Sequence, residues 1–231
     1  MLTAADGNEF RAFSARTEAA SAPGMVILPD VRGLHPFYEE LAIRFTEAGV
    51  HATAIDYFGR TAGVGDRGDG FDYERHVAQL EDRSVALDVA AAIAHVRSAE
   101  GGGASAVFTV GFCMGGRLSF NQAAEDNGLA GVIGFYGRVA EEEPGDPSAP
   151  VALAGRFDFP VLGLFGGADR KILPEHIDAF REALDDAGVP NELVVYEGAP
   201  HSFFDRSFAE HQGAAADAWT RMLRFVEANR S

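Results

Sequence analysis

The stretch Thr-Val-Gly-Phe-Cys-Met-Gly-Gly-Arg, residues 109–117, decides the fold of this chain. An apolar run, residues 106–110, leads into it, and a run with helical character, residues 117–125, leads out of it. Glycines around Cys113 suit a strand that turns sharply into a helix, because side chains beside such a turn would clash with the crowded backbone. The stretch therefore predicts that Cys113 stands on a tight turn at the end of a strand, with its side chain toward solvent.

The glycine spacing around Cys113 matches the nucleophile elbow, Gly-x-nucleophile-x-Gly, with cysteine where serine is usual. The helix that begins there turns its positive end toward the thiol, which favours the thiolate, the nucleophilic form. Two other interpretations compete with this one. A lone cysteine is commonly a small buried hydrophobe. A glycine cluster after a strand can also bind phosphate, but this one lacks the Lys-Ser/Thr of a P-loop and the spacing Gly-x-Gly-x-x-Gly.

The composition is that of a globular protein. The 231 residues suit one α/β domain with a substantial core. The single cysteine excludes an internal disulfide and favours a reducing cytoplasm. No apolar run is long enough to span a membrane, and residues 1–6 lack the character of a signal peptide. The net charge of −16 argues against nucleic acid or membrane partners. We therefore expect a cytoplasmic monomer or weak homodimer.

Strands alternate with helices along the chain. Apolar runs that predict strands lie at residues 24–29, 51–56, 106–110, 129–136, 161–165 and 193–196, and those at 24–29 and 129–136 are typical of strands buried on both faces. Helical patterns lie at residues 36–49, 85–96, 117–125, 174–188 and 219–226. In the first of these helices we expect Phe37, Leu41 and Phe45 on one face. The alternation predicts an α/β fold over residues 1–231, with a mostly parallel sheet and helices on both of its faces.

The remaining segments carry weaker signals. Residues 9–16 alternate loosely and predict an edge strand or a hairpin arm. Residues 57–76 are rich in glycine and charge and predict a long irregular loop, which is usually functional or disordered. Residues 137–160 predict an acidic connector that is too short to form a separate lid domain.

Three polar residues, Cys113, Asp169 and His201, follow the ends of predicted strands. In a parallel sheet, functional side chains lie in the loops at the carboxyl ends of the strands. Each residue also has an ordinary explanation, since Asp169 can cap the turn before Pro174 and a lone histidine is usually a surface residue. Together they follow the chain order nucleophile, acid, histidine, which is the order found in α/β-hydrolases.

The chemistry of such a triad follows from the residue types. His201 takes the thiol proton or stabilises the thiolate, and later protonates the leaving group. Asp169 holds the imidazole in the right tautomer and stabilises its charged form. The backbone amides of Met114 and Val31 are the candidates for the oxyanion hole. A metal site is a poor alternative, because the histidines show no paired spacing and Cys113 has no second thiol.

At these residues the chain resembles the dienelactone hydrolases (carboxymethylenebutenolidases). The resemblance covers nearly the whole chain and rests on residues 111–116, 166–169 and 198–203, which read Gly-Phe-Cys-Met-Gly-Gly, Gly-Gly-Ala-Asp and Gly-Ala-Pro-His-Ser-Phe. Cysteine in the elbow is the specific part, because most α/β-hydrolases carry serine there. The resemblance implies a single-domain α/β-hydrolase fold without a lid. It also implies hydrolysis of an enol-lactone to a linear dicarboxylic keto acid by a Cys-His-Asp triad, with no cofactor.

The resemblance assigns further residues to the site. An acidic residue in the oxyanion loop contacts the resting thiol and helps to ionise it, and Asp30 takes this position, with a side chain shorter by a methylene than the glutamate of a family enzyme. Two arginines bind the substrate carboxylate. Arg206 lies one position later after His201 than the family pattern places it, and Arg75 is the match for the other. Ser202 is assigned a hydrogen bond to substrate.

Two alternatives stay open at the level of the sequence. One is a promiscuous carboxylesterase or thioesterase whose substrate lacks a carboxylate. The other belongs to a different class, a non-catalytic redox-sensing or binding protein that uses Cys113. The presence of both Asp169 and His201 counts against the second, because a sensor has no use for a complete triad.

Overall fold

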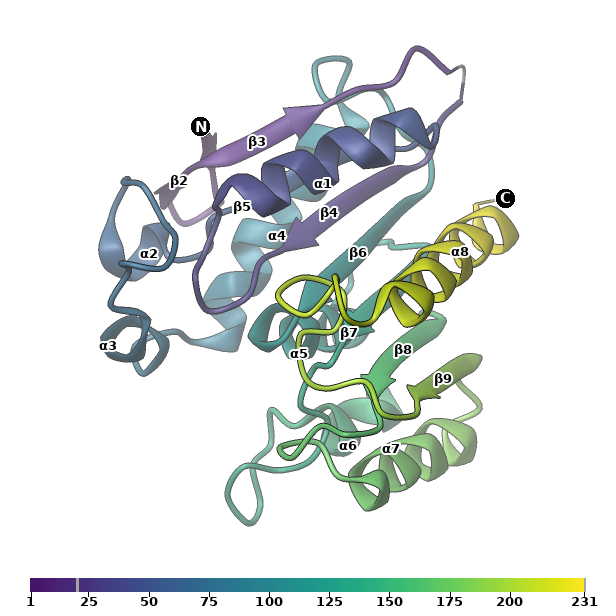
Figure 1. Ribbon diagram of the computed structural model, residues 1–231. Coiled ribbons are helices and arrows are strands. Elements are labelled where there is room, and N and C mark those ends of the chain that lie inside the picture. The colour runs from purple at the N-terminus through teal and green to yellow at the C-terminus, as the bar shows by residue number, and fades with distance from the viewer. Residues whose placement is uncertain (20, 231) are drawn as a thin grey trace. The chain divides into compact units, whose positions relative to one another are not determined.

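Figure 1 shows the computed structural model, which describes residues 1–19 and 21–230. The chain divides into two compact units, one over Met1–Thr109 and one over Val110–Asn229. The division falls within strand β6 (Val107–Phe112), which leads into the stretch around Cys113. Both units alternate strands with helices, as the sequence predicts.

The first unit contains β1 (Leu2–Thr3), β2 (Glu9–Phe10), β3 (Ala12–Ala15), β4 (Gly24–Leu28), α1 (Pro36–Glu47), β5 (His51–Ile55), α2 (Gly59–Ala62), α3 (Tyr73–Val77) and α4 (Asp82–Arg97). β4 lies parallel to β5, with Gly24 opposite His51, and β3 lies antiparallel to β5 on its other side. All residues of β4 and β5 are buried, because α1 and α4 both pack on these strands, α1 in front of them and α4 behind them in Figure 1.

The segment at residues 9–16 has the predicted form. β3 is only partly buried and pairs with β5 as an edge strand, and β2 pairs with β1 as the arm of a hairpin. β-strands at an edge have one unpaired side and need less apolar sequence, which explains the loose alternation.

Helix α1 begins and ends where its sequence predicts. Pro36 supplies the first helical position, where its fixed φ costs nothing, and Gly49 follows the end with a φ of +82° that favours glycine. Phe37, Leu41 and Phe45 share one face as their spacing predicts, but only Leu41 and Phe45 are buried, and Phe37 is partly exposed. Tyr38 is buried in its place, because one residue along a helix turns the side chain by about 100°.

The prediction of an irregular loop over residues 57–76 is wrong in part, since this segment contains the short helices α2 and α3. Arg67 organises the segment through two local contacts. Its Nε lies 3.1 Å from Oδ2 of Asp56, with both side chains buried, and its guanidinium carbon lies 4.7 Å from the centre of the Phe71 ring. Contacts of this kind leave no hydrophobic period in the sequence.

The second unit contains α5 (Met114–Asn121), η1 (Gln122–Ala124), β7 (Gly131–Phe135), α6 (Pro150–Leu153), η2 (Ala154–Arg156), β8 (Val161–Gly166), α7 (Pro174–Asp186), β9 (Asn191–Tyr196) and α8 (Gln212–Asn229). β7, β8 and β9 are parallel and lie in that order, with Val132 opposite Val161 and Val161 opposite Asn191. β7 and β8 are wholly buried, because α5 packs on β7 and α8 packs on both strands.

The helices of the second unit bury the expected side chains. α7 buries Ile177, Phe180 and Leu184, which the sequence places on one face. The connector at residues 137–160 is irregular except for α6 and η2. Among the residues that the structure describes, no helix is both long enough and apolar enough to span a bilayer.

Candidate active site

Cys113 occupies the turn between β6 and α5. Its φ of +56° and ψ of −117° are rare for a residue other than glycine. The amide of Cys113 donates a hydrogen bond of 3.0 Å to the carbonyl oxygen of Phe135, and its own carbonyl accepts one of 3.0 Å from Gly116. These bonds fix the backbone at the turn, and the side chain remains partly exposed. The strand, the tight turn and the helix of an elbow are all present.

Two glycines of the elbow leave no room for a side chain. A Cβ atom on Gly111 would lie 1.8 Å from the carbonyl oxygen of Gly115, and one on Gly116 would lie 2.7 Å from that of Phe135. Both obstacles are backbone atoms, which cannot move aside as a flexible side chain can. The sequence pattern therefore has a steric cause in this structure.

The helix after the turn begins directly at the elbow, as expected. α5 begins at Met114, three residues before the run with helical character at residues 117–125, and continues as the short 3₁₀ helix η1 up to Ala124. The Met114 amide is the first of the helix, and the first amides of a helix have no intrahelical acceptor. It is therefore placed to donate to an oxyanion beside Cys113, although its part in an oxyanion hole stays a prediction.

Asp169 and His201 lie together at the carboxyl ends of β8 and β9. The Nδ1 atom of His201 is 2.6 Å from Oδ2 of Asp169, and Oδ1 accepts a hydrogen bond of 2.8 Å from the amide of Lys171. Burial alone would raise the pKa of Asp169, but the hydrogen bonds from His201 and Lys171 outweigh it and hold the pKa below its ordinary value. Asp169 is therefore an ionised acceptor for the imidazole.

The imidazole of His201 is strongly biased toward its charged form. Burial lowers the pKa of His201, but the hydrogen bond to Asp169 and the interaction with Cys113 raise it to about 9. In the parts of the chain that the structure describes, Nε2 is buried and no partner meets the geometry of a hydrogen bond with it. The Cys113 side chain is nevertheless close enough to shift the titration of His201. A cationic imidazole beside a thiol stabilises the thiolate.

The loop after β9 carries the remaining candidates of this unit. Ser202 has a φ of +62°, and its carbonyl oxygen accepts hydrogen bonds from the amides of Asp205 and Ser207, at 3.3 and 3.1 Å. Arg206 is exposed in the same loop. The contacts of Ser202 and Arg206 with substrate stay predictions.

The other predicted residues lie in the first unit. Asp30 follows β4 and is buried, and Arg32 donates to both of its carboxylate oxygens, with Nε 3.1 Å from each. Burial would raise the pKa of Asp30, but Arg32 outweighs it and lowers the pKa. Val31 lies in the turn after Asp30, and Arg75 is exposed in α3. The assigned contact of Asp30 with the thiol, the Val31 amide in the oxyanion hole and the substrate contact of Arg75 stay predictions.

Comparisons with known proteins identify the family of this chain. The model of the dienelactone hydrolase family matches residues 10–229. The chain belongs to the dienelactone hydrolase family. Members of this family hydrolyse carboxylic esters or lactones, and this chain is a hydrolase of that class.

Relatives across the family match most of the chain. A protein of Yersinia pestis, assigned by inference as a carboxymethylenebutenolidase, is 32% identical over 94% of this chain and 83% of its own length. The carboxymethylenebutenolidase of Rhodococcus opacus is 30% identical over 92% of this chain and 84% of its own. The crystal structure of an inferred dienelactone hydrolase from Klebsiella pneumoniae gives a TM-score of 0.85 at 29% identity, and the match covers 97% of this chain and 96% of that one. This dienelactone hydrolase family member thus has the single-domain α/β fold, with a mostly parallel sheet flanked by helices.

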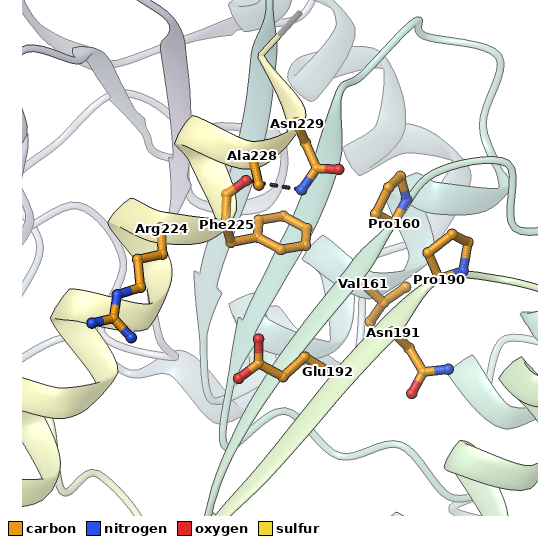
Figure 2. A pocket seen from close by; sticks show the side chains of 9 residues that line it. All are labelled: Pro160, Val161, Pro190, Asn191, Glu192, Arg224, Phe225, Ala228 and Asn229. Atoms are coloured by element: carbon orange, nitrogen blue, oxygen red, sulfur yellow. Dashed lines mark hydrogen bonds between the residues drawn. The ribbon is translucent and has the colours of Figure 1, made fainter.

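A hollow of about 320 Å³ lies at the amino-terminal ends of β8 and β9, away from Asp169 and His201. Its lining residues are Pro160, Val161, Pro190, Asn191, Glu192, Arg224, Phe225, Ala228 and Asn229 (Figure 2). The Asp169–His201 pair follows the opposite ends of the same strands, where parallel α/β sheets hold their chemistry. We therefore do not include this hollow in the candidate active site of this family member.

Sequence reasoning missed two buried residues that lie beside this family member's candidate site. Arg117, in the first turns of α5, is buried and donates to Oδ2 of Asp146 at 2.7 Å and to Oγ of Ser148 at 2.9 Å, which fastens the acidic connector to the elbow helix. Tyr136 follows β7, is buried, and has a φ of +38°. The sequence predicts Tyr136 as the last residue of a strand, whereas β7 ends at Phe135, so the one available signal is its place at a strand end.

Proposed function

We propose that this protein opens enol-lactones such as dienelactone, or cleaves related activated esters, through Cys113, His201 and Asp169. The observation that carries the proposal is the 2.6 Å hydrogen bond between His201 and Asp169, in a pair whose titration responds to Cys113 on its strained turn. The names of the relatives support the substrate class, because both those of Yersinia pestis and of Rhodococcus opacus refer to carboxymethylenebutenolide.

In the proposed reaction, the Cys113 thiolate attacks the carbonyl carbon of the lactone and forms a tetrahedral intermediate. The amides of Met114 and Val31 are proposed to donate hydrogen bonds to its oxyanion. The intermediate collapses when the bond between the acyl carbon and the ring oxygen breaks, and Nε2 of His201 gives its proton to that oxygen. The product of this half-reaction is a thioester on Cys113 with an opened chain.

Water completes the cycle. The neutral His201 takes a proton from water as the oxygen attacks the thioester carbon, and the second tetrahedral intermediate expels the Cys113 thiolate. Asp169 accepts the Nδ1–H bond throughout, so that Nε2 is the nitrogen that exchanges the proton. With a pKa of about 9, His201 carries its proton at neutral pH before substrate arrives, which suits the first half-reaction.

Other residues complete the proposal. Arg206 and Arg75 bind the carboxylate of the substrate, Ser202 donates a hydrogen bond to it, and Asp30 assists the ionisation of Cys113. None of these steps needs a cofactor. We also propose the reducing cytoplasm as the compartment, because it would keep the lone Cys113 as a thiol.

Intact-protein mass spectrometry after mixing with a dienelactone and, separately, with p-nitrophenyl acetate tests the proposal. We expect wild type to turn over the lactone and to carry an acyl adduct on Cys113, and we expect Cys113→Ala to do neither. Cys113→Ser, which keeps the shape of the side chain, is the matched control for folding. Turnover of the acetate alone would replace the lactonase by a general esterase. If neither compound is turned over and no adduct forms, the catalytic proposal is wrong and a redox or binding role for Cys113 takes its place.

A further inference from the structure

Tyr136 lies directly after β7 and reaches the loop that follows β9. Its hydroxyl donates a hydrogen bond of 3.0 Å to Oδ1 of Asp205. The centre of its ring lies 5.0 Å from that of the His201 imidazole, with the two planes inclined by 55°. Tyr136 therefore contacts the same loop at two points, at the histidine where it begins and at the aspartate further along.

The backbone around Tyr136 is fixed on both sides. The preceding carbonyl, that of Phe135, accepts the hydrogen bond from the Cys113 amide, and the Tyr136 amide donates one of 2.8 Å to the carbonyl oxygen of Leu164. The chain then crosses the elbow helix so closely that a Cβ atom on Gly137 would lie 2.5 Å from the carbonyl carbon of Gly116. Its neighbours thus hold Tyr136 at a φ of +38°, which a tyrosine would not otherwise adopt.

The loop that receives Tyr136 is itself closed. The carbonyl oxygen of Ser202 accepts the amides of Asp205 and Ser207, so the segment after His201 forms a turn. The Tyr136 hydroxyl ties the side chain of Asp205 to β7, the strand whose last carbonyl is bonded to the elbow. A chain of hydrogen bonds thus connects the His201 loop, through Tyr136 and β7, to the backbone of Cys113.

We propose that Tyr136, through its hydrogen bond to Asp205 and its contact with the His201 ring, is a positioning residue that keeps the imidazole directed at Cys113. The inference rests on the proposed function and adds a residue to its site. Asp169 alone fixes the Nδ1 side of the ring, about which the imidazole can still swing. Tyr136 lies against the ring from another side and removes that freedom. A displacement of about 1 Å at a catalytic group can cost on the order of 100-fold in rate.

The test compares Tyr136→Phe, which keeps the ring and removes the hydroxyl, with Asp205→Asn, which keeps Oδ1 as an acceptor. Cys113 is the only cysteine in the chain, so its alkylation by iodoacetamide as a function of pH reports on the Cys113–His201 pair without any substrate. For Tyr136→Phe we expect a shifted pH profile, alkylation slower by roughly 5- to 10-fold at neutral pH, and kcat lower by about 10-fold with KM unchanged. For Asp205→Asn we expect the profile and kcat to stay within about 2-fold of wild type, because the acceptor is retained.

Three results would overturn the inference. The first is a Tyr136→Phe protein with a lower Tm but with the alkylation profile and kcat of wild type, which would make Tyr136 a core residue only. The second is an equal loss in Tyr136→Phe and Asp205→Asn, which would assign the effect to the charge of Asp205. The third applies if Tyr136→Phe does not fold. Asp205→Ala then removes the same hydrogen bond at a partly exposed position, and a wild-type alkylation profile in that variant would overturn the inference. A wild-type enzyme that is alkylated but hydrolyses no ester would refute the proposed function, while the alkylation comparison would still decide the role of Tyr136.

Discussion

The charge on His201 makes the stability of this protein depend on pH between neutrality and about pH 9. A pKa raised from its ordinary value of 6.5 to about 9 corresponds to about 3 kcal/mol of interaction that favours the protonated imidazole in the folded state. The folded protein then binds more protons than the unfolded chain in this window, so the free energy of unfolding falls as pH rises. The contribution is fully present below about pH 6.5 and is lost as pH passes through about 9.

Replacing Asp169 by asparagine should remove much of this dependence. The carboxylate of Asp169 is the first of the groups that raise the pKa of His201, ahead of Cys113, and an amide does not attract the imidazolium. We expect the loss of stability between about pH 6 and about pH 9.5 to be smaller in Asp169→Asn than in wild type by on the order of 1–2 kcal/mol.

Urea denaturation at the two pH values measures the effect, with the fluorescence of Trp219, the only tryptophan, as the signal. Asp178→Asn is the matched control, because it neutralises an exposed acid of α7 that is not among the groups that shift the pKa of His201. Its loss of stability between the two pH values should equal that of wild type. Taking the difference between proteins cancels the groups that titrate alike in all of them. Equal losses in wild type and in Asp169→Asn would refute the reasoning, because the 2.6 Å hydrogen bond would then have no share in the charge of His201.

Three further predictions concern packing and substrate. Gly116→Ala should destabilise the protein by about 1–3 kcal/mol in urea denaturation and reduce esterase activity, because its Cβ would lie 2.7 Å from a backbone oxygen. Gly155→Ala is the control and should change neither quantity, because no atom lies within 4 Å of its added Cβ. Arg117→Ala should cost about 1–3 kcal/mol of stability by the same measurement, since it leaves the acidic connector without its buried donor; an unchanged urea midpoint would contradict this. Arg206→Ala should raise KM for a dienelactone on the order of 10-fold or more and leave KM for p-nitrophenyl acetate nearly unchanged. An equal rise for both substrates would exclude carboxylate binding by Arg206.

The elements that local sequence determines could be predicted. Pro36 and Gly49 bound α1, and the side chains Ile177 and Phe180 repeat with helical spacing in α7, so both helices were readable without any knowledge of their neighbours. The glycines beside Cys113 likewise predict the turn, because the backbone atoms that exclude a side chain at Gly111 lie only a few residues away in the chain.

What could not be predicted depends on partners far away in the sequence. Phe37 and Tyr38 are both aromatic and adjacent, and only the packing on the sheet decides which one is buried. An arginine is usually a surface residue, and Arg117 can be buried only because Asp146, which is distant in the sequence, accepts its hydrogen bond. Tyr136 looked like one more apolar residue at a strand end, because its strained backbone and its bond to the loop after β9 arise only in the assembled unit.

The turn at Cys113 also bears on how such enzymes change during evolution. The backbone hydrogen bonds of residue 113 with Phe135 and Gly116 fix the position of the reactive atom, whereas the side chain determines only whether that atom is sulfur or oxygen. A single-base change that exchanges sulfur for oxygen would leave the attacking atom in nearly the same place, and no compensating change in the backbone would be needed. A valine or threonine would not be accepted as readily, since branching at Cβ is least compatible with a φ of +56°. Lineages built on this turn are therefore free to alternate between thiol and hydroxyl chemistry while their architecture stays constant.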